Sequence, residues 1–513
     1  MGIIAKQSIK GTVVTYIGVA IGFITTFFVM TRFLTTEEVG LVRVMIDAAT
    51  LFVGLASLGT QSSLIRFAPW FRQTSDTKHQ TSNTKHQTLD TSKGFWFWAV
   101  VVPFIGFLIF AIIYWACKVP ITQWFSEKSP LFVDYYYFVL PIAFFLLYQT
   151  VFETCSNVLM RIVVPRAVRE IGIRIGLLAL YLLYAFRVIS MDGFIIALSG
   201  VYAIATLINL GYVLATEHIR FKPDWAFLKA NTKIVRDYVL YTGFLIISAV
   251  TSVLAPSLSS FFVTAQMGLN YTGIFAIATY MAVMVSIPYR SVTAIAAPQL
   301  ADAIQKGRLS EANTLTKQVV NNTFLVGVTI FLVIWINIDL IYTVLPNGVT
   351  YSAARTCVFI LMLSQLIMAT FSIIINAISY GRYYALSLVL SAILTAGAII
   401  ANNLLIPHFG INGAAMSNLI SYGLYMVLAL IVVMGCMKIN PLSRKMLTTL
   451  GLTLVVLGLN YSLWYEFNLH QTNVWISSLV RDCLLIPYLF VIYKLQVSDE
   501  INALLRSIFI PRH

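Results

Sequence analysis

Charged side chains inside long apolar segments are the residues of this sequence that could do chemistry. Three arginines (Arg43, Arg174 and Arg290) and two carboxylates (Asp47 and Glu153) lie within such segments. A charge held in hydrocarbon is costly and usually faces a water-filled cavity or a partner, so each is a candidate functional residue. Arginine binds phosphate oxygens in a fork and stays charged, whereas a buried carboxyl group can take up a proton or a cation.

Four arginines are candidates for binding an anionic substrate. Arg290 is flanked on both sides by apolar sequence and is the strongest of them. Arg43 and Asp47 are one helical turn apart, so they either neutralise each other as an i,i+4 pair or face a cavity. Arg32 is expected at the outer end of the first span, where it either binds substrate or extends to the membrane interface. Arg174 is the fourth candidate and is expected toward the cytoplasmic half of its span.

Two carboxylates, Asp47 and Glu153, are candidates for binding a coupling proton or sodium ion. A buried carboxyl group responds to its surroundings, which change when a transporter changes conformation. The five cysteines lie singly in or beside apolar segments, and the sequence therefore predicts no metal site. His79 and His86 belong to a short tandem duplication in a polar loop, which no other ligand type accompanies.

The elements that position these residues are transmembrane helices. Of the 513 residues, 59% are hydrophobic and 11% are charged, about half the charge content of a soluble protein. The apolar residues form long blocks, which predicts an all-α membrane protein with about 14 spans. The expected spans are 12–34, 38–66, 94–117, 131–160, 167–187, 193–217, 237–264, 270–298, 318–340, 353–380, 383–406, 411–436, 446–466 and 474–494.

Lysines and arginines are distributed unevenly between the expected connections. Roughly 26 of the 34 fall on one side of the membrane if the spans are numbered as above. Arg161, Arg166 and Arg169 form one such basic connection. The positive-inside rule then predicts cytoplasmic N- and C-termini in the inner membrane of a bacterium, and it explains the net charge of +14 without a nucleic-acid partner.

An internal repeat relates the two halves of the chain. Gly40 and Gly273 occupy matching positions in connections between two spans, and Gly193 and Gly413 do so in another connection. The alternative is that glycine is simply common in tight helix connections. A repeat predicts two six-helix lobes around a central cavity, followed by two extra helices. The expected parts are a first lobe (1–217), a cytoplasmic linker (218–236), a second lobe (237–437) and two helices with a cytoplasmic tail (438–513).

Several segments resemble Wzx-type polysaccharide flippases of the multidrug/oligosaccharidyl-lipid/polysaccharide (MOP) superfamily. The similar segments are TRFLTTEEVGL (31–41), LGTQSSLIRF (58–67), APQLAD (297–302), KGR (306–308) and NNLLIPHFGINGAA (402–415). The resemblance covers nearly the whole chain. One departure concerns the seventh span, where many relatives carry an acidic residue and this chain has Pro-Ser-Leu-Ser-Ser at 256–260.

The resemblance implies a two-lobed fold, alternating access and a lipid-linked substrate. That substrate would be an oligosaccharide on undecaprenyl pyrophosphate, carried from the cytoplasmic to the outer leaflet for O-antigen or other surface polysaccharide assembly. It implies no enzymatic activity and no cofactor apart from a possible coupling H⁺ or Na⁺. Membrane lipids, a glycan polymerase and chain-length machinery are the expected partners.

Two other functions compete with this one. An ion-coupled multidrug or cation antiporter of the same superfamily would commonly carry an acidic residue in its first span and have about twelve spans, but segment 12–34 contains neither Asp nor Glu. A membrane enzyme of glycan assembly would need a catalytic acid on a sizeable outer loop. Glu37 and Glu38 are the acids expected in the first outer turn, and that turn is short.

Overall fold

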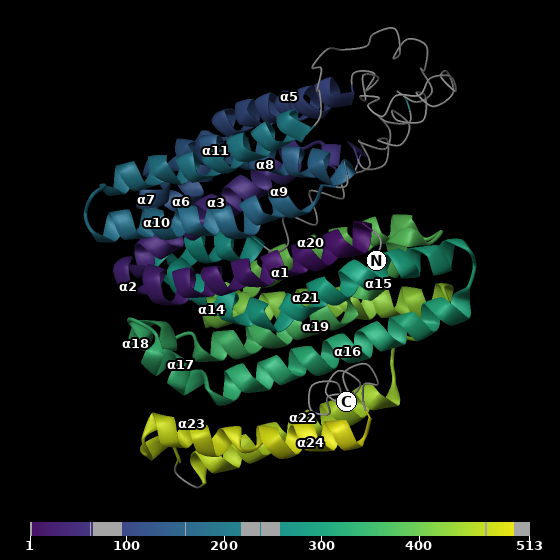
Figure 1. Cartoon of the computed structure of the whole chain (residues 1–513). Helices are drawn as coiled ribbons and strands as arrows, with labels where there is room; N and C mark the ends of the chain where they lie inside the picture. Colours follow the sequence, from purple (N-terminus) through teal and green to yellow (C-terminus); the bar gives the residue numbers. More distant parts are fainter. Residues whose placement is uncertain are drawn as a thin grey trace. The chain divides into compact units, whose positions relative to one another are not determined.

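The computed structural model describes residues 3–61, 63–64, 95–159, 161–216, 236, 257–466 and 469–496. Within these ranges the chain forms helices joined by short turns, without a β-strand (Figure 1). Twelve helical segments in them are long and apolar enough to cross a membrane. They correspond to all but the fifth and seventh of the fourteen expected spans, so the all-α membrane fold with about 14 spans is confirmed.

The fifth and seventh expected spans are not among the twelve long apolar helices, each for a different reason. The fifth is a composite helix that changes from α to π and back, and it carries several charged residues. The seventh, expected at 237–264, is described from residue 257 onward, and residues 257–267 are helical. The expected linker 218–236 also lies outside the described residues, apart from Arg236.

The chain divides into two compact units at Gly273. The described elements of the first unit are α1 (Ile3–Ile24), η1 (Thr25–Met30), α2 (Thr31–Phe33), α3 (Thr36–Ala56), α5 (Phe95–Ala116), α6 (Lys118–Ser126), α7 (Pro130–Asp134), η2 (Tyr136–Phe138), α8 (Val139–Val158), α9 (Val163–Ala167), η3 (Val168–Gly172), α10 (Ile173–Ala185) and α11 (Met191–Thr216). Residues 257–267 and the first turn of α14 (Leu269–Val283) complete this unit.

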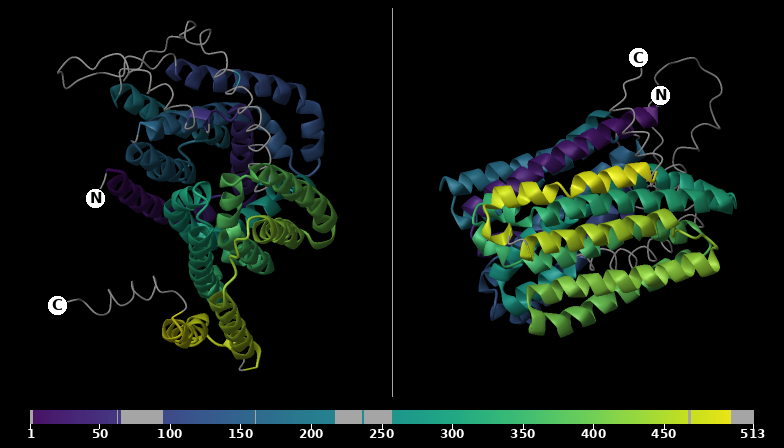
Figure 2. Two further views of the ribbon diagram at one scale, coloured as in Figure 1. Left: turned by 90° about the vertical axis from the view of Figure 1, so that its right-hand side faces the viewer. Right: turned by 90° about the horizontal axis from the view of Figure 1, so that it is seen from below.

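The second unit holds the rest of α14 and the helices that follow. These are η4 (Met284–Ser286), α15 (Ile287–Gln305), α16 (Leu309–Ile336), α17 (Ile338–Val344), α18 (Gly348–Ser352), α19 (Arg355–Tyr380), α20 (Tyr384–Phe409), α21 (Ile411–Cys436), α22 (Arg444–Tyr465), η5 (Leu469–Gln471), α23 (Val474–Asp482) and α24 (Leu485–Lys494). Within this unit α21 packs against both α19 and α20, and the left panel of Figure 2 shows its helices nearly end-on.

The order of elements supports the internal repeat. In the first unit the long helix α5 is followed by two short helices and then by the long helix α8. In the second unit α16 is likewise followed by two short helices and then by α19. Helix α11 begins at Met191 and α21 at Ile411, 220 residues later, and both have 26 residues. The same sequence of long and short helices therefore occurs twice.

The glycines that the repeat pairs with one another are in direct contact. A Cβ atom added to Gly40 of α3 would overlap the carbonyl oxygen of Leu269, and one added to Gly273 of α14 would overlap the carbonyl oxygen of Thr36. The two contacts are reciprocal, which is the pattern that a local two-fold axis produces. Thr36 and Asn270 stand beside this crossing, with 2.8 Å between Oγ1 and Oδ1. Glycine is required at both positions because the backbones touch there.

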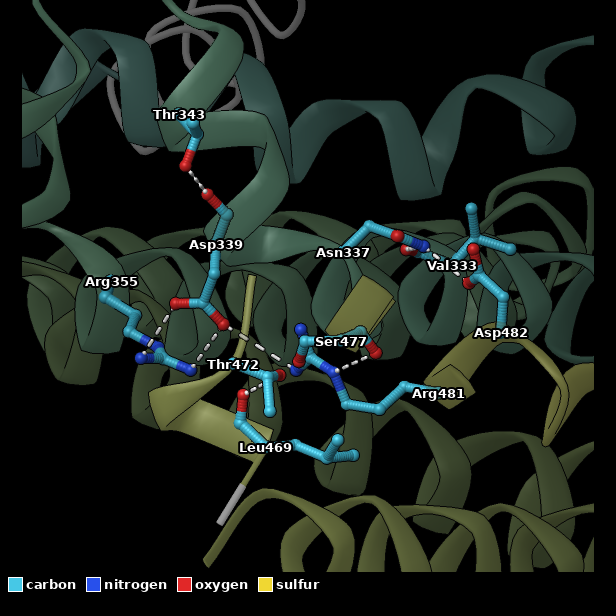
Figure 3. A network of polar contacts seen from close by, with 10 residues as sticks. All are labelled: Val333, Asn337, Asp339, Thr343, Arg355, Leu469, Thr472, Ser477, Arg481 and Asp482. Carbon is cyan, nitrogen blue, oxygen red and sulfur yellow. Dashed lines mark hydrogen bonds and ion pairs between the residues drawn. The ribbon is translucent and has the colours of Figure 1, made fainter. Parts of the chain in front are cut away.

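Helices α22 to α24 pack on the second unit through α16 and α17 (Figure 1). A polar network joins them (Figure 3). Asp339 of α17 forms a two-pronged ion pair with Arg355 of α19, with N–O distances of 3.0 and 3.1 Å. Its Oδ2 also lies 3.6 Å from Nη1 of Arg481 in α23. Both guanidinium groups lie over the Trp464 ring, at 5.3 and 4.4 Å from its centre.

Candidate substrate- and ion-binding residues

A chain of four charged side chains crosses the first unit. Glu153 of α8 lies 2.8 Å from Nη1 of Arg169, whose Nη2 is 3.3 Å from Glu170. Glu170 in turn lies 3.3 Å from Nη2 of Arg174 in α10. The two glutamates are largely buried, whereas the Arg169 side chain is 42% exposed. Two positive and two negative charges alternate in this network, so its four side chains together carry no net charge.

Arg174, the last residue of this charge network, contacts the first helix, α1. Nη1 of Arg174 donates a hydrogen bond to the carbonyl oxygen of Gly18 in α1. A Cβ atom on Gly22 would overlap that same Nη1 atom, and one on Gly18 would overlap the carbonyl oxygen of Glu170. These two glycines have the G-x-x-x-G spacing that lets helices approach closely in a membrane. The guanidinium group therefore occupies the space that the missing side chain of Gly22 leaves open.

Arg174 lies at the middle of the composite helix, 11 residues before its last residue, Ala185. It follows Val163, the first residue of the composite helix, by 11 residues, which corresponds to about 16 Å along the axis. That is about half of a hydrocarbon layer roughly 30 Å thick. The π-helical segment η3 carries Arg169 and Glu170 one turn before it, and π-bulges of this kind are frequent at functional sites.

Arg43 and Asp47 form a pair on α3. Nε of Arg43 donates to Oδ2 of Asp47 at 2.7 Å, and the two side chains are 15% and 12% exposed. Of the two interpretations that the sequence left open, the i,i+4 pair is the contact found. The pair lies about 10 Å beyond the start of α3 at Thr36. Its two charges are therefore already neutralised in this conformation.

Arg32 and Arg290 lie apart from these groups. Arg32 is exposed at the end of the first span, with its guanidinium carbon 5.7 Å from the centre of the Phe33 ring. Arg290 is exposed and has no ion pair or hydrogen bond with another described residue. It is the fourth residue of α15, which continues to Gln305. The 3-10 turn η4 and Pro288 lie just before it, so Arg290 follows a break in the helix that begins at Leu269.

The structure thus brings together two of the six predicted site residues in one network, Glu153 and Arg174. The residues that connect them, Arg169 and Glu170, were missed by the sequence analysis, which assigned Arg169 to a cytoplasmic basic connection. The i,i+4 spacing of Glu170 and Arg174 is the signal that could have identified them. Within the described ranges, no group of three His, Cys, Asp or Glu side chains could hold a metal ion. His79 and His86 lie outside those ranges.

Comparison with known proteins identifies a family and a fold. The model of a family described as "Polysaccharide biosynthesis protein" matches residues 4–303. Comparison with curated protein sequences gives no match. Among solved structures, the lipid II flippase MurJ in an inward closed conformation has a TM-score of 0.69 and 12% identity, with 95% of this chain and 99% of that chain covered.

Two further solved structures are MATE transporters. An inward-facing multidrug resistance MATE family transporter of the MOP superfamily has a TM-score of 0.58 and 12% identity, covering 84% of this chain and 99% of its own. A MATE transporter from Vibrio cholerae has a TM-score of 0.54 and 13% identity, covering 84% and 98%. At such identities the likeness concerns the fold, which is that of MOP-superfamily membrane transporters.

Proposed function

Because the chain belongs to the family of polysaccharide biosynthesis proteins, we propose that it is a flippase for lipid-linked oligosaccharides. The substrate would be an oligosaccharide repeat unit on undecaprenyl pyrophosphate, moved from the cytoplasmic to the outer leaflet by alternating access. The cell would use it to assemble a surface polysaccharide such as O-antigen. The protein would act in the bacterial inner membrane with both termini in the cytoplasm, where the uneven distribution of lysine and arginine supports that orientation.

The observation that carries this proposal is that Arg174 lies at the middle of the composite helix and contacts Glu170 and the Gly18 carbonyl group there. Charge at this depth is costly and is retained for function. A diphosphate needs cationic donors that stay charged during transfer, and arginine supplies two parallel N–H donors for phosphate oxygens. Arg43, Arg32 and Arg290 are the further arginines proposed to contact the substrate during the cycle.

The fold supports a large lipid-linked cargo. The matched flippase structure acts on lipid II, by its title, and its match covers 95% of this chain. The multidrug transporter matches cover 84% of this chain, with lower TM-scores. An ion-coupled multidrug or cation antiporter remains the second candidate, because those structures share the fold. Asp47 and Glu153 are proposed to bind the coupling H⁺ or Na⁺ in either case.

Membrane lipids would be the immediate surroundings of such a flippase. The described helices expose many large apolar side chains, such as those of Ile112, Trp115, Leu454 and Phe490. A glycan polymerase and the chain-length machinery would receive the transported units in the outer leaflet. Transfer between leaflets and delivery to these partners can be tested separately, because transfer can be measured in vesicles that lack the polymerase and the chain-length machinery.

The test is a transport measurement with two arginine variants. The purified protein in proteoliposomes should move a fluorescent undecaprenyl-pyrophosphate-linked sugar between leaflets, and Arg174→Ala should reduce the rate at least tenfold. Arg187→Ala, which changes a loop arginine of the same unit with φ of 57°, serves as the matched control. In cells, deletion of the gene should leave lipid-linked repeat units in the cytoplasmic leaflet and abolish the surface glycan. Transport of cationic dyes with no movement of the lipid-linked sugar would favour the antiporter instead.

A further inference from the structure

Buried polar side chains lie along the contact between α8 and α11, two helices that pack side by side in the first unit (Figure 1). Gln149 and Glu153 follow each other by one turn on α8, and Asn209 lies on α11. Gln149 and Asn209 are 0% exposed, and Glu153 is 6% exposed. Neither amide atom of Asn209 has a hydrogen-bond partner in the described part of the chain, and the Gln149 side chain has a hydrogen-bond contact with the Glu153 carboxylate that leaves its amide oxygen unpaired.

The register of the two helices brings these side chains to one level. Thr206 of α11 donates a hydrogen bond to the carbonyl oxygen of Phe145 in α8 at 2.7 Å. As the fourth and sixth spans, α8 and α11 run in the same direction. Three or four residues beyond this hydrogen bond, Asn209 therefore stands beside Gln149. Glu153, whose carboxylate has a hydrogen-bond contact with the Gln149 side chain, follows one turn further along.

A ligand is needed to explain this arrangement. Buried amide groups are almost always hydrogen-bonded, and leaving them without a partner is costly. The oxygens available are the Gln149 and Asn209 amide oxygens and the Glu153 carboxylate. Oxygen ligands of this kind suit hard cations, whereas the carboxylate disfavours an anion. From this geometry we propose that Gln149, Glu153 and Asn209 form a site for a sodium ion between α8 and α11.

Arg169 competes with the ion for Glu153. It reaches the carboxylate at 2.8 Å from the exposed side, and the other charged groups that face Glu153 are Arg166 and Glu170. If an anionic ligand draws the half-exposed Arg169 away, Glu153 is left buried and unpaired, which is strongly unfavourable. Sodium binding removes that penalty. Anion binding at Arg169 and sodium binding at Glu153 should therefore favour each other by linkage, a step that rests on the proposed function.

Sodium binding can be tested on the purified full-length protein without any lipid substrate. We expect saturable ²²Na⁺ binding and a higher unfolding temperature in NaCl than in choline chloride at equal ionic strength. Glu153→Gln, Gln149→Leu and Asn209→Leu should each lower the ²²Na⁺ affinity at least tenfold. Asn460→Leu is the matched control, because Asn460 of α22 is also buried with an unpartnered amide oxygen, and it should bind sodium as the wild type does.

The leucine variants remain informative about folding. Removal of the unpartnered Asn209 amide should leave stability in choline chloride equal or higher, so for Asn209→Leu the loss of the sodium-dependent increment cannot be confused with unfolding. Stabilisation by low pH alone, without a sodium effect, would assign a proton to Glu153 and overturn the sodium site. Absence of any ion effect would indicate that the amides hold water, and sodium binding that survives all three substitutions would place the ion elsewhere. Both results would overturn the proposal.

Competition with Arg169 has its own measurement. Arg169→Gln should bind ²²Na⁺ more tightly than the wild type, because the competing cation is gone. Inorganic pyrophosphate should tighten sodium binding about fivefold or more in the wild type, within the usual range of coupling between sites, and should have no effect on Arg169→Gln. If pyrophosphate changes nothing, the linkage is refuted. The flippase function is judged separately by the leaflet-transfer measurement, so failure of one does not imply failure of the other.

Discussion

Replacement of Asp339 by asparagine should destabilise the second unit by about 3 to 5 kcal/mol. The carboxylate lies 3.6 Å from Nη1 of Arg481, whose side chain is 1% exposed. At that distance and an effective dielectric constant of about 20, the attraction is roughly 4.6 kcal/mol. The pair with Arg355, which is 38% exposed, adds about 1 kcal/mol or less. Because asparagine keeps the shape but removes the charge, Arg481 would be left buried with its counterion gone.

Unfolding of the purified protein can be followed through a buried thiol. Cys357 of α19 is 0% exposed and reacts with a thiol dye only when the second unit opens. The other cysteines would be changed to serine, namely Cys117, Cys155, Cys436 and Cys483. The matched control is Asp482→Asn, since Asp482 accepts a hydrogen bond from the Asn337 amide at 2.7 Å and an amide oxygen can do the same. We expect that control to cost less than about 1 kcal/mol.

A double variant distinguishes a stranded charge from lost packing. Asp339→Asn combined with Arg481→Met should be more stable than Asp339→Asn alone, because methionine fills the space over Trp464 without a charge. A loss below about 1 kcal/mol for Asp339→Asn, or a double variant that is no more stable than this single variant, would refute the reasoning. The network would then contribute as little as an exposed set of ion pairs to the packing of helices α22, α23 and α24 on α16 and α17.

Two further predictions concern the close approaches of glycine in the first unit. Gly18→Ala should destabilise the protein by about 1 to 3 kcal/mol, because the added Cβ atom would overlap the backbone of Glu170. Gly22→Ala should leave thermal stability nearly unchanged but lower sugar-lipid transport, because its Cβ atom would displace the guanidinium group of Arg174. Equal losses of stability in thermal unfolding would contradict this difference. The double variant Thr36→Cys with Asn270→Cys should form a disulfide under oxidant, beside the contact of Gly40 with Gly273. The disulfide should stop transport until a reductant is added, because α3 and α14 have to separate there during alternating access. Full transport by the cross-linked protein would show that these two helices stay in contact throughout the cycle.

Hydropathy and glycine spacing were sufficient to predict the scaffold. A helix that crosses hydrocarbon must be long and apolar, and twelve of the fourteen expected spans match described helices that meet both conditions. The internal repeat could also be inferred from glycine spacing, because the close backbone contact between α3 and α14 requires glycine at both Gly40 and Gly273. The segment around Arg169 was harder, because it combines a basic membrane boundary with the start of a composite helix. The positive-inside rule treats such an arginine as a cytoplasmic charge and does not reveal its partner.

Side-chain pairing was the part that the sequence could not provide. Spacing gave the pair of Arg43 and Asp47 as one of two interpretations, because i,i+4 neighbours on one helix can meet whatever the tertiary structure. Glu153 and Arg169 are 16 residues apart on different helices, and their contact depends on how α8 and the composite helix pack. The contacts of Arg290 could not be predicted from hydropathy either, since its exposure in α15 depends on how that helix packs.

The neutrality of the charge network has a consequence for transport. An isolated arginine at the centre of a membrane span costs about 2.5 to 3.5 kcal/mol or more, and Arg174 avoids this cost through Glu170 and the Gly18 carbonyl. Under the proposed function, a diphosphate that binds Arg169 or Arg174 must replace a glutamate as partner, which leaves that glutamate buried without a counterion. The exchange is favourable only if the released carboxylate is neutralised at the same time. A cation taken up at Glu153 would do this in addition to Arg166, which also faces that carboxylate. Substrate and ion would then bind together, because the four paired side chains carry no net positive charge.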